Sequence, residues 1–272
     1  MVTNSASGDM KTFRKIDSSV PALGMGTWQL GGYGDDPIPA LRRGLELGMT
    51  LIDTAEVYGN GYSETLIKEA IAGFERSKLF IISKVREFRP TRENILKAAE
   101  ASVARLGTNM DLYLLHWPPE DRNLKERMKG LEDVAKKGLT KHIGVSNFPV
   151  KLIEEARSYL STIDIAAVQN RMSIFYKDDL QTVVPYTQRE GMMYLAYSPL
   201  EHGKLGNLVT NTRIKSVADR YGKTPVQVAL NWLICIEPVV AIPKAGKVKH
   251  IEEDAGATGW RLSKENWDLL NT

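Results

Sequence analysis

The chain has 272 residues, with 36 Lys or Arg against 33 Asp or Glu and a formal net charge of +3. Charges this balanced and dispersed give no basic stripe for nucleic acid, and no apolar run approaches the ~18 residues of a membrane span. Residues 1–10 lack the apolar core of a signal peptide. We therefore expect a cytoplasmic protein that binds neither nucleic acid nor membranes.

The chain length suits one α/β barrel, which commonly uses ~250 residues. Because no linker, low-complexity tract or internal repeat divides the sequence, we expect a disordered N-terminus over residues 1–10 and one domain over residues 11–272. Cys235 is the single cysteine, so neither a disulfide nor a Cys-based metal site can form within the chain. We expect Cys235 to pack in the core, and we expect no metal.

Eight apolar or β-rich runs follow one another along the chain, ending near Gly26, Asp53, Lys84, His116, Ser146, Gln169, Tyr197 and Lys244. Runs such as 79–82 and 112–115 are continuously apolar, which is typical of parallel strands buried on both faces. Helical patterns lie between most of them, for example over residues 91–106. The sequence predicts an α/β fold, a (β/α)8 TIM barrel, with a β-hairpin near the N-terminus.

The longest interval between runs extends from Tyr197 to Lys244. It predicts a Gly/Asn-rich loop over residues 203–211 and then two helices, the second starting at Pro225 with Thr224 as its cap. The last helix, from about Ser263, reaches the end of the chain, so we expect an open pocket. His202 directly precedes the predicted loop over residues 203–211, and the sequence assigns it no function.

Three of the apolar runs end in an ionisable residue, namely Asp53, Lys84 and His116. About one strand-plus-helix unit separates each from the next, so a parallel sheet brings an acid, a base and an imidazole to one edge. Tyr58 adds a phenol on the segment that leaves the first of these strands. This set suits proton-coupled chemistry on a carbonyl group.

Residue types suggest a role for each member. Hydride addition to a carbonyl places negative charge on oxygen, and Tyr58 is the candidate that protonates it. The Lys84 ammonium would favour the tyrosinate, Asp53 would keep Lys84 charged, and a neutral His116 would orient the substrate carbonyl. Seen alone, Asp53 could equally cap a helix, and Lys84 could reach into solvent.

Seven segments, in this order, resemble the aldo-keto reductases: Gly24 to Trp28, Asp53 to Gly59, Lys84 after Ile-Ile-Ser, His116-Trp117-Pro118, Ile143 to Phe148, Ala196 to Leu200 and Ile242-Pro243-Lys244. The resemblance implies a (β/α)8 barrel, a nicotinamide cofactor bound without a Rossmann motif, and reversible reduction of aldehydes or ketones to alcohols. It implies Asp53, Tyr58, Lys84 and His116 as the catalytic residues.

The resemblance also implies a cofactor-binding set that serves NADP(H), with NAD(H) as a second cofactor. This set comprises Gly26, Thr27, Trp28, Asp53, Ser146, Asn147, Gln169, Tyr197, Ser198, Pro199, Leu200, Lys244, His250, Glu253 and Asp254. Without the resemblance, Asn147 would equally fit a helix N-cap and Tyr197 a core aromatic. The small carbonyl or alcohol substrate would contact Trp28, Tyr58, His116 and Trp117, although Trp117 is equally suited to packing.

The chain departs from the family pattern at the adenosine-phosphate end. After Lys244, many relatives have a Ser, an Arg six positions beyond the Lys, then Glu and Asn, whereas this chain has Ala245, His250, Glu253 and Asp254. Because histidine cannot make the bidentate guanidinium contact to a phosphate, we expect NADPH preference with appreciable NADH use.

Two functions of other classes stay open at the level of sequence. A Schiff-base aldolase would use Lys84 as its nucleophile. A regulatory or redox-sensing subunit would bind the nicotinamide cofactor with little turnover. Small or aromatic aldehydes and 2-oxo aldehydes are the substrates that we expect, and a monomer is the family-level default.

Overall fold

The computed structural model describes residues 9–121, 123–201 and 205–271. The expectation for residues 1–8 and the question of His202 lie outside these ranges. Met10, which we assigned to the terminal segment, is the first residue of a β-strand. No helix in the described part of the chain is both long enough and apolar enough to cross a membrane.

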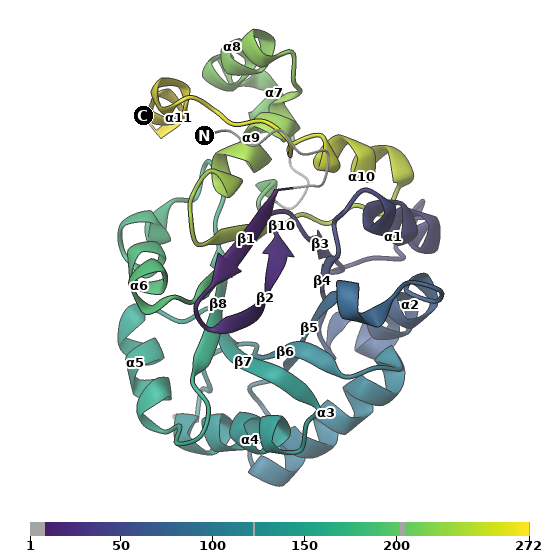
Figure 1. Cartoon of the computed structure of the whole chain (residues 1–272), viewed down its shortest axis with the longest axis vertical. Helices are drawn as coiled ribbons and strands as arrows, with labels where there is room; N and C mark the ends of the chain where they lie inside the picture. Colours follow the sequence, from purple (N-terminus) through teal and green to yellow (C-terminus); the bar gives the residue numbers. More distant parts are fainter. Residues whose placement is uncertain (1–8, 122, 202–204, 272) are drawn as a thin grey trace.

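Eight parallel strands form the barrel in sequence order (Figure 1). They are β3 (Met25–Gly26), β4 (Leu51–Asp53), β5 (Phe80–Val85), β6 (Met110–Leu115), β7 (Thr140–Ser146), β8 (Ile165–Arg171), β9 (Met193–Tyr197) and β10 (Val239–Ile242). A parallel bridge between Leu23 and Ala241 joins the segment before β3 to β10. The Gly26 amide also donates to the Pro243 carbonyl at 2.7 Å. The predicted (β/α)8 barrel is confirmed.

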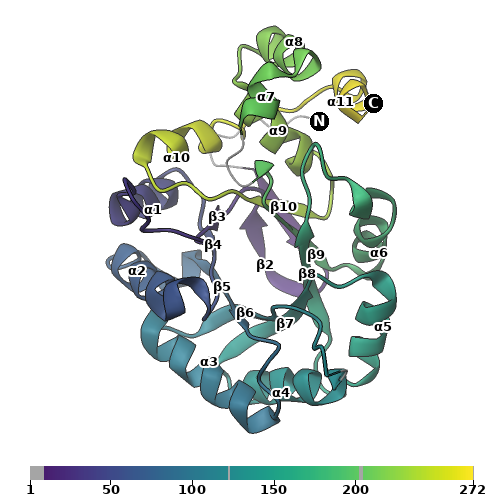
Figure 2. The ribbon, with the colours of Figure 1, turned by 180° about the vertical axis from the view of Figure 1, so that it is seen from behind.

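Helices surround the barrel, as both views show (Figures 1 and 2). They are α1 (Pro37–Glu46), α2 (Tyr62–Ala70), α3 (Arg92–Leu106), α4 (Leu124–Lys136), α5 (Val150–Ser158), α6 (Val183–Glu190), α7 (Gly206–Thr210), α8 (Thr212–Tyr221), α9 (Pro225–Ile234), α10 (Val248–Ala255) and α11 (Lys264–Asn271). Three short 3-10 segments are η1 (Tyr58–Gly61), η2 (Arg76–Lys78) and η3 (Asp178–Gln181).

Side chains cap the start of two helices, and the cap at Thr224 is the one that the sequence predicts. The Thr91 hydroxyl accepts a hydrogen bond from the Asn94 amide at the start of α3. Thr224 and Gln227 form a reciprocal capping box at the start of α9, where Pro225 occupies the first turn. The interval 203–211 is not a loop throughout, because α7 lies within it and buries Leu208.

A hairpin closes one end of the barrel. Strands β1 (Met10–Phe13) and β2 (Ile16–Pro21) are antiparallel and lie across the barrel opening (Figure 1). Phe13, Ile16 and Val20 pack against the inward-facing apolar side chains of the barrel strands. The predicted N-terminal hairpin is therefore present, and its apolar side chains cover this end of the barrel interior.

Alternation along the strands decides which side chains enter the interior. Leu51 of β4, Ile82 of β5 and Leu114 of β6 belong to the inner cluster, whereas their neighbours face the helices. Because every second side chain of a strand points to the same face, the next inward positions are Asp53 on β4, Lys84 on β5 and His116, which directly follows β6. The fold thus places a polar layer directly on an apolar one.

Cys235, expected in the core, is half-buried against it at the end of α9. Its thiol donates to the Asn231 side-chain oxygen at 3.3 Å.

Candidate active site

Asp53, Tyr58 and Lys84 form one hydrogen-bonded cluster at the carboxyl end of the barrel. Lys84 Nζ lies 2.8 Å from Asp53 Oδ2, 2.8 Å from the Thr54 carbonyl and 3.1 Å from the Tyr58 hydroxyl. Lys84 is fully buried and Asp53 is 3% exposed. Since an ammonium has three donors, all three are used within this cluster.

The hydrogen bond from Lys84 determines what the Tyr58 hydroxyl can do. Its oxygen accepts from the ammonium, so its own proton is free to point into the adjoining cavity. Burial raises the pKa of Tyr58, and Lys84 offsets only part of this effect. Lys84 thus lowers the pKa of Tyr58, as expected from the sequence, but burial outweighs Lys84, so the net pKa is raised and Tyr58 is protonated at neutral pH.

Lys84 is a stable cation in this setting. Burial by itself lowers the pKa of Lys84, but Asp53 and Tyr58 outweigh burial, and the pKa lies above its ordinary value. Asp53 thus keeps the buried Lys84 ammonium charged, as expected from the sequence.

His116 follows β6 and stands beside the phenol. Its ring centroid lies 5.8 Å from that of Tyr58, with the ring planes at 72°. Burial, with the charges of Lys84 and Arg86, lowers the pKa of His116 to about 3. The imidazole is therefore neutral at physiological pH, so one ring nitrogen donates and the other accepts.

Amide and hydroxyl side chains from β7, β8 and β9 border the cluster. Gln169 Nε2 donates to Asp53 Oδ1 at 2.7 Å. Asn147 Nδ2 donates to Ser146 Oγ and to the His116 carbonyl, and the Tyr197 hydroxyl donates to Asn147 Oδ1. Asn147 is not a helix N-cap, because Pro149 holds that position in α5. These groups orient one another at the rim of the barrel.

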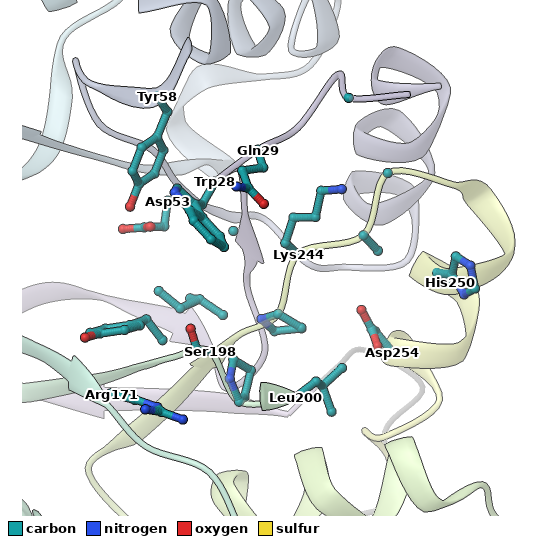
Figure 3. Close-up of a pocket in the computed structure, with 18 of the residues that line it drawn as sticks. Trp28, Gln29, Asp53, Tyr58, Arg171, Ser198, Leu200, Lys244, His250 and Asp254 are labelled. Atoms are coloured by element: carbon teal, nitrogen blue, oxygen red, sulfur yellow. The ribbon is translucent and has the colours of Figure 1, made fainter. Parts of the chain in front are cut away.

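A cavity of about 850 Å³ opens above this layer. In Figure 3, Tyr58 and Asp53 stand on one side of it and His250 and Asp254 on the other, with Trp28 and Lys244 between them. All the predicted cofactor and substrate residues line this cavity except Thr27. Thr27 is fully buried and donates to the Asp53 carbonyl from behind the wall. Lys84 also lies behind the wall, beneath Tyr58.

The far end of the cavity is lined by both cations and acids. Lys244 Nζ contacts Asp35 Oδ2, while Lys247, His250 and Glu253 also line this end. Asp254 is 3% exposed and also lines this end of the cavity. Burial, with a smaller contribution from Glu253, holds the pKa of Asp254 well above its ordinary value. A buried carboxyl facing a cavity is suited to a ligand that carries an amine.

Sequence reasoning missed several residues of the cavity wall. Arg171 is two residues beyond Gln169 on β8, so the alternation of the strand could have found it. Asp35, Tyr33 and Gln29 lie on the segment between β3 and α1. That segment has no periodic pattern, and nothing in the sequence places it against residues 244–247.

Comparison with known proteins agrees with this geometry. The sequence model of the Aldo/keto reductase family matches residues 22–272. Methylglyoxal reductase YeaE of Escherichia coli strain K12 is 34% identical over 261 residues, which cover 94% of this chain and 91% of that protein.

Solved structures agree as well. The thermostable aldo-keto reductase Tm1743, solved with the inhibitor epalrestat, has a TM-score of 0.89 at 37% identity, covering 97% of this chain and 98% of its own. An aldo-keto reductase from Klebsiella pneumoniae, solved with NADPH, has a TM-score of 0.88 at 32% identity, covering 96% and 94%. Shared sequence along nearly the whole chain and a shared barrel lead to one conclusion: this chain belongs to the aldo/keto reductase family.

Proposed function

We propose that this chain is an NADP(H)-dependent oxidoreductase that reversibly reduces aldehydes or ketones to alcohols, with Tyr58 as proton donor. The observation that carries the proposal is the 3.1 Å contact from Lys84 Nζ to the Tyr58 hydroxyl, with the other lysine donors held by Asp53 and Thr54. This arrangement leaves the phenol proton available to a molecule in the cavity.

The residues of the cavity fit a nicotinamide dinucleotide. Ser146, Asn147 and Gln169 are amide and hydroxyl groups suited to a carboxamide, and Tyr197 offers an aromatic ring beside them. Lys244 is a cation for the phosphate end, and the buried carboxyl of Asp254 suits the amine of adenine. The solved Klebsiella relative is described as a complex with NADPH. When bound, this cofactor supplies hydride to the carbonyl carbon.

Each catalytic side chain has a distinct task in this proposal. The neutral His116 donates an N–H to the substrate carbonyl oxygen and so sets its direction. Tyr58 then delivers its proton to that oxygen, and the tyrosinate that forms lies against the Lys84 ammonium. Asp53 keeps Lys84 charged throughout. In the reverse direction, the same phenolate accepts the proton of the alcohol.

We further propose small or aromatic aldehydes and 2-oxo aldehydes as substrates. Trp28 and Trp117 line the cavity and are each about half exposed, at 45% and 48%, which indicates an open aromatic entrance. Methylglyoxal reductases of Escherichia coli and Salmonella typhi stand among the relatives. Methylglyoxal, a small 2-oxo aldehyde, is accordingly the first substrate to test.

The proposal is tested by replacing Tyr58 with Phe and measuring NADPH oxidation with a panel of aldehydes. Loss of the proton donor should lower kcat by about 10²- to 10⁴-fold, the range typical of general acids. Tyr62→Phe is the matched control, since Tyr62 is exposed and does not line the cavity. Turnover by Tyr58→Phe equal to that of Tyr62→Phe would contradict the proposal.

The two alternatives make different predictions. An aldolase needs a neutral lysine on the cavity wall, whereas Lys84 is buried and its pKa is raised, so borohydride should trap no adduct at Lys84. A regulatory subunit would bind NADPH without consuming it in the presence of any aldehyde of the panel. The cytoplasmic location and the monomeric state stay predictions, and light scattering after size-exclusion chromatography tests the second.

A further inference from the structure

The cation expected to bind the adenosine phosphate already has an anionic partner within the chain. Lys244 Nζ lies 2.7 Å from Asp35 Oδ2, and the two residues are 209 positions apart in sequence. Their side chains are 33% and 12% exposed, and both line the cavity. Lys244 stands on the cavity wall between Trp28 and His250 (Figure 3).

The backbone on both sides fixes the Asp35 carboxylate in this position. Gly31 N donates to Asp35 Oδ2 at 3.2 Å, and Asp36 N donates to the Gly246 carbonyl at 2.7 Å. Gly246 leaves the space that the carboxylate fills, because a Cβ there would lie 2.0 Å from Asp35 Cγ. The acid is therefore built into this end of the cavity, and it is more than a chance surface pair.

From this geometry we propose that Asp35 is a specificity-determining residue that weakens the preference for NADP(H) over NAD(H). The inference rests on the proposed function, because it concerns which nicotinamide cofactor the cavity accepts. Binding of the 2′-phosphate requires Lys244 to leave Asp35 or to share its charge with it. The Asp35 carboxylate then lies near a second anion, which costs binding energy.

The chemistry of the two cofactors makes this cost selective. NADP(H) carries a phosphate on the adenosine ribose, whereas NAD(H) carries a hydroxyl there, and a carboxylate can accept a hydrogen bond from a ribose hydroxyl. Nearby, Ala245 and His250 supply neither the hydroxyl nor the guanidinium of the family pattern. Asp35 and Lys244 together thus form a neutral pair that accommodates either cofactor.

The test measures binding, not turnover. Dissociation constants for NADP⁺ and NAD⁺ are determined by quenching of tryptophan fluorescence for wild type, Asp35→Asn and Asp36→Asn. Asp36 is a matched control, because it carries the same charge on the neighbouring residue but is exposed and does not line the cavity. Asp35→Ser is a second variant, and thermal melting of each protein reports on folding.

Removal of the Asp35 charge should lower the dissociation constant for NADP⁺ about tenfold and leave that for NAD⁺ unchanged or higher. A tenfold change in a dissociation constant is the size of effect expected from one modest interaction between charges. Asp36→Asn should change neither constant by more than about threefold. If folded Asp35 variants keep the wild-type ratio of the two constants, the inference is wrong while the proposed function stands. If both Asp35 variants unfold, the pair of Asp35 and Lys244 serves the stability of the fold and the inference on cofactor preference is wrong. If wild type binds neither nucleotide, the proposed function itself fails.

Discussion

Replacing Asp53 with Asn tests the electrostatics on which the candidate site depends. The change removes the carboxylate that lies 2.8 Å from Lys84 Nζ but preserves the size of the side chain. Lys84 is fully buried, so its charge cannot be compensated by water. Breaking a buried ion pair from one side typically costs about 3–5 kcal/mol of unfolding free energy, and we expect that loss at pH 7.

The pH dependence of Asp53→Asn adds a signature of its own. In wild type the pKa of Lys84 is raised, so its contribution to stability persists through the neutral range and is lost only as the pH rises above the ordinary lysine value. In the variant burial is unopposed by Asp53 and lowers the pKa of Lys84. The unfolded chain then binds the proton more tightly, so the variant should gain stability from pH 7 to pH 9.

The assay is urea unfolding followed by circular dichroism, with Lys84→Met and the double variant Asp53→Asn/Lys84→Met completing the cycle. Because the double variant removes both charges, it should be more stable than the sum of the single losses by about 1–3 kcal/mol. A loss below about 1 kcal/mol in Asp53→Asn, or additive losses in the cycle, would refute the reasoning.

Three further predictions concern single residues. With a pKa of about 3, His116 stays neutral between pH 5 and 8. His116→Gln should therefore lower kcat/KM for aldehyde reduction without changing the shape of its pH profile in this range. A step near pH 6.5 in the wild-type profile that disappears in the variant would contradict this prediction. Glu132 is buried, and its hydrogen bonds outweigh burial and lower its pKa. Glu132→Gln should therefore lower the free energy of unfolding by about 2–3 kcal/mol at pH 7, and by less below pH 4, where the wild-type carboxylate becomes protonated and loses its stabilising effect. A melting temperature lowered equally at both pH values would count against this prediction. In Gly144→Ala the new Cβ would lie 2.3 Å from the Ala167 carbonyl oxygen. Urea unfolding should therefore show a free energy of unfolding lowered by at least about 1–3 kcal/mol. The control is Gly206→Ala, whose Cβ would meet no atom within 4 Å and should leave the free energy of unfolding nearly unchanged.

The sequence predicted those parts of the site that follow from strand periodicity. Asp53, Lys84 and His116 each stand one alternation beyond an inward apolar residue, and the repeat of strand and helix fixes their spacing. Local rules were similarly sufficient for Thr224 as the cap and Pro225 as the first residue of α9. Both kinds of signal depend only on near neighbours in the chain.

What the sequence could not predict depends on distant neighbours or on burial. Asp35 meets Lys244 only because the barrel closes between its first and last strands, and no local pattern of residues 27–36 encodes that contact. The sign of the pKa shift of Tyr58 depends on how strongly burial opposes Lys84, which residue types alone do not give. Helix α7 contributes one buried apolar side chain, Leu208, too few for a helical period to be read.

Burial, whose effect on pKa values could not be predicted from the sequence, also determines the charge balance of the candidate site. Burial raises the pKa of Tyr58 further above neutral and lowers the pKa of His116 to about 3, so both side chains are neutral at pH 7, while the charges of Asp53 and Lys84 cancel one another. The four side chains therefore carry no net charge before reaction. Under the proposed role of Tyr58, proton transfer creates a phenolate 3.1 Å from an ammonium that is already fixed in place. Because Lys84 needs no rearrangement to meet that new charge, the site is preorganised for proton transfer rather than for tight binding of the neutral carbonyl.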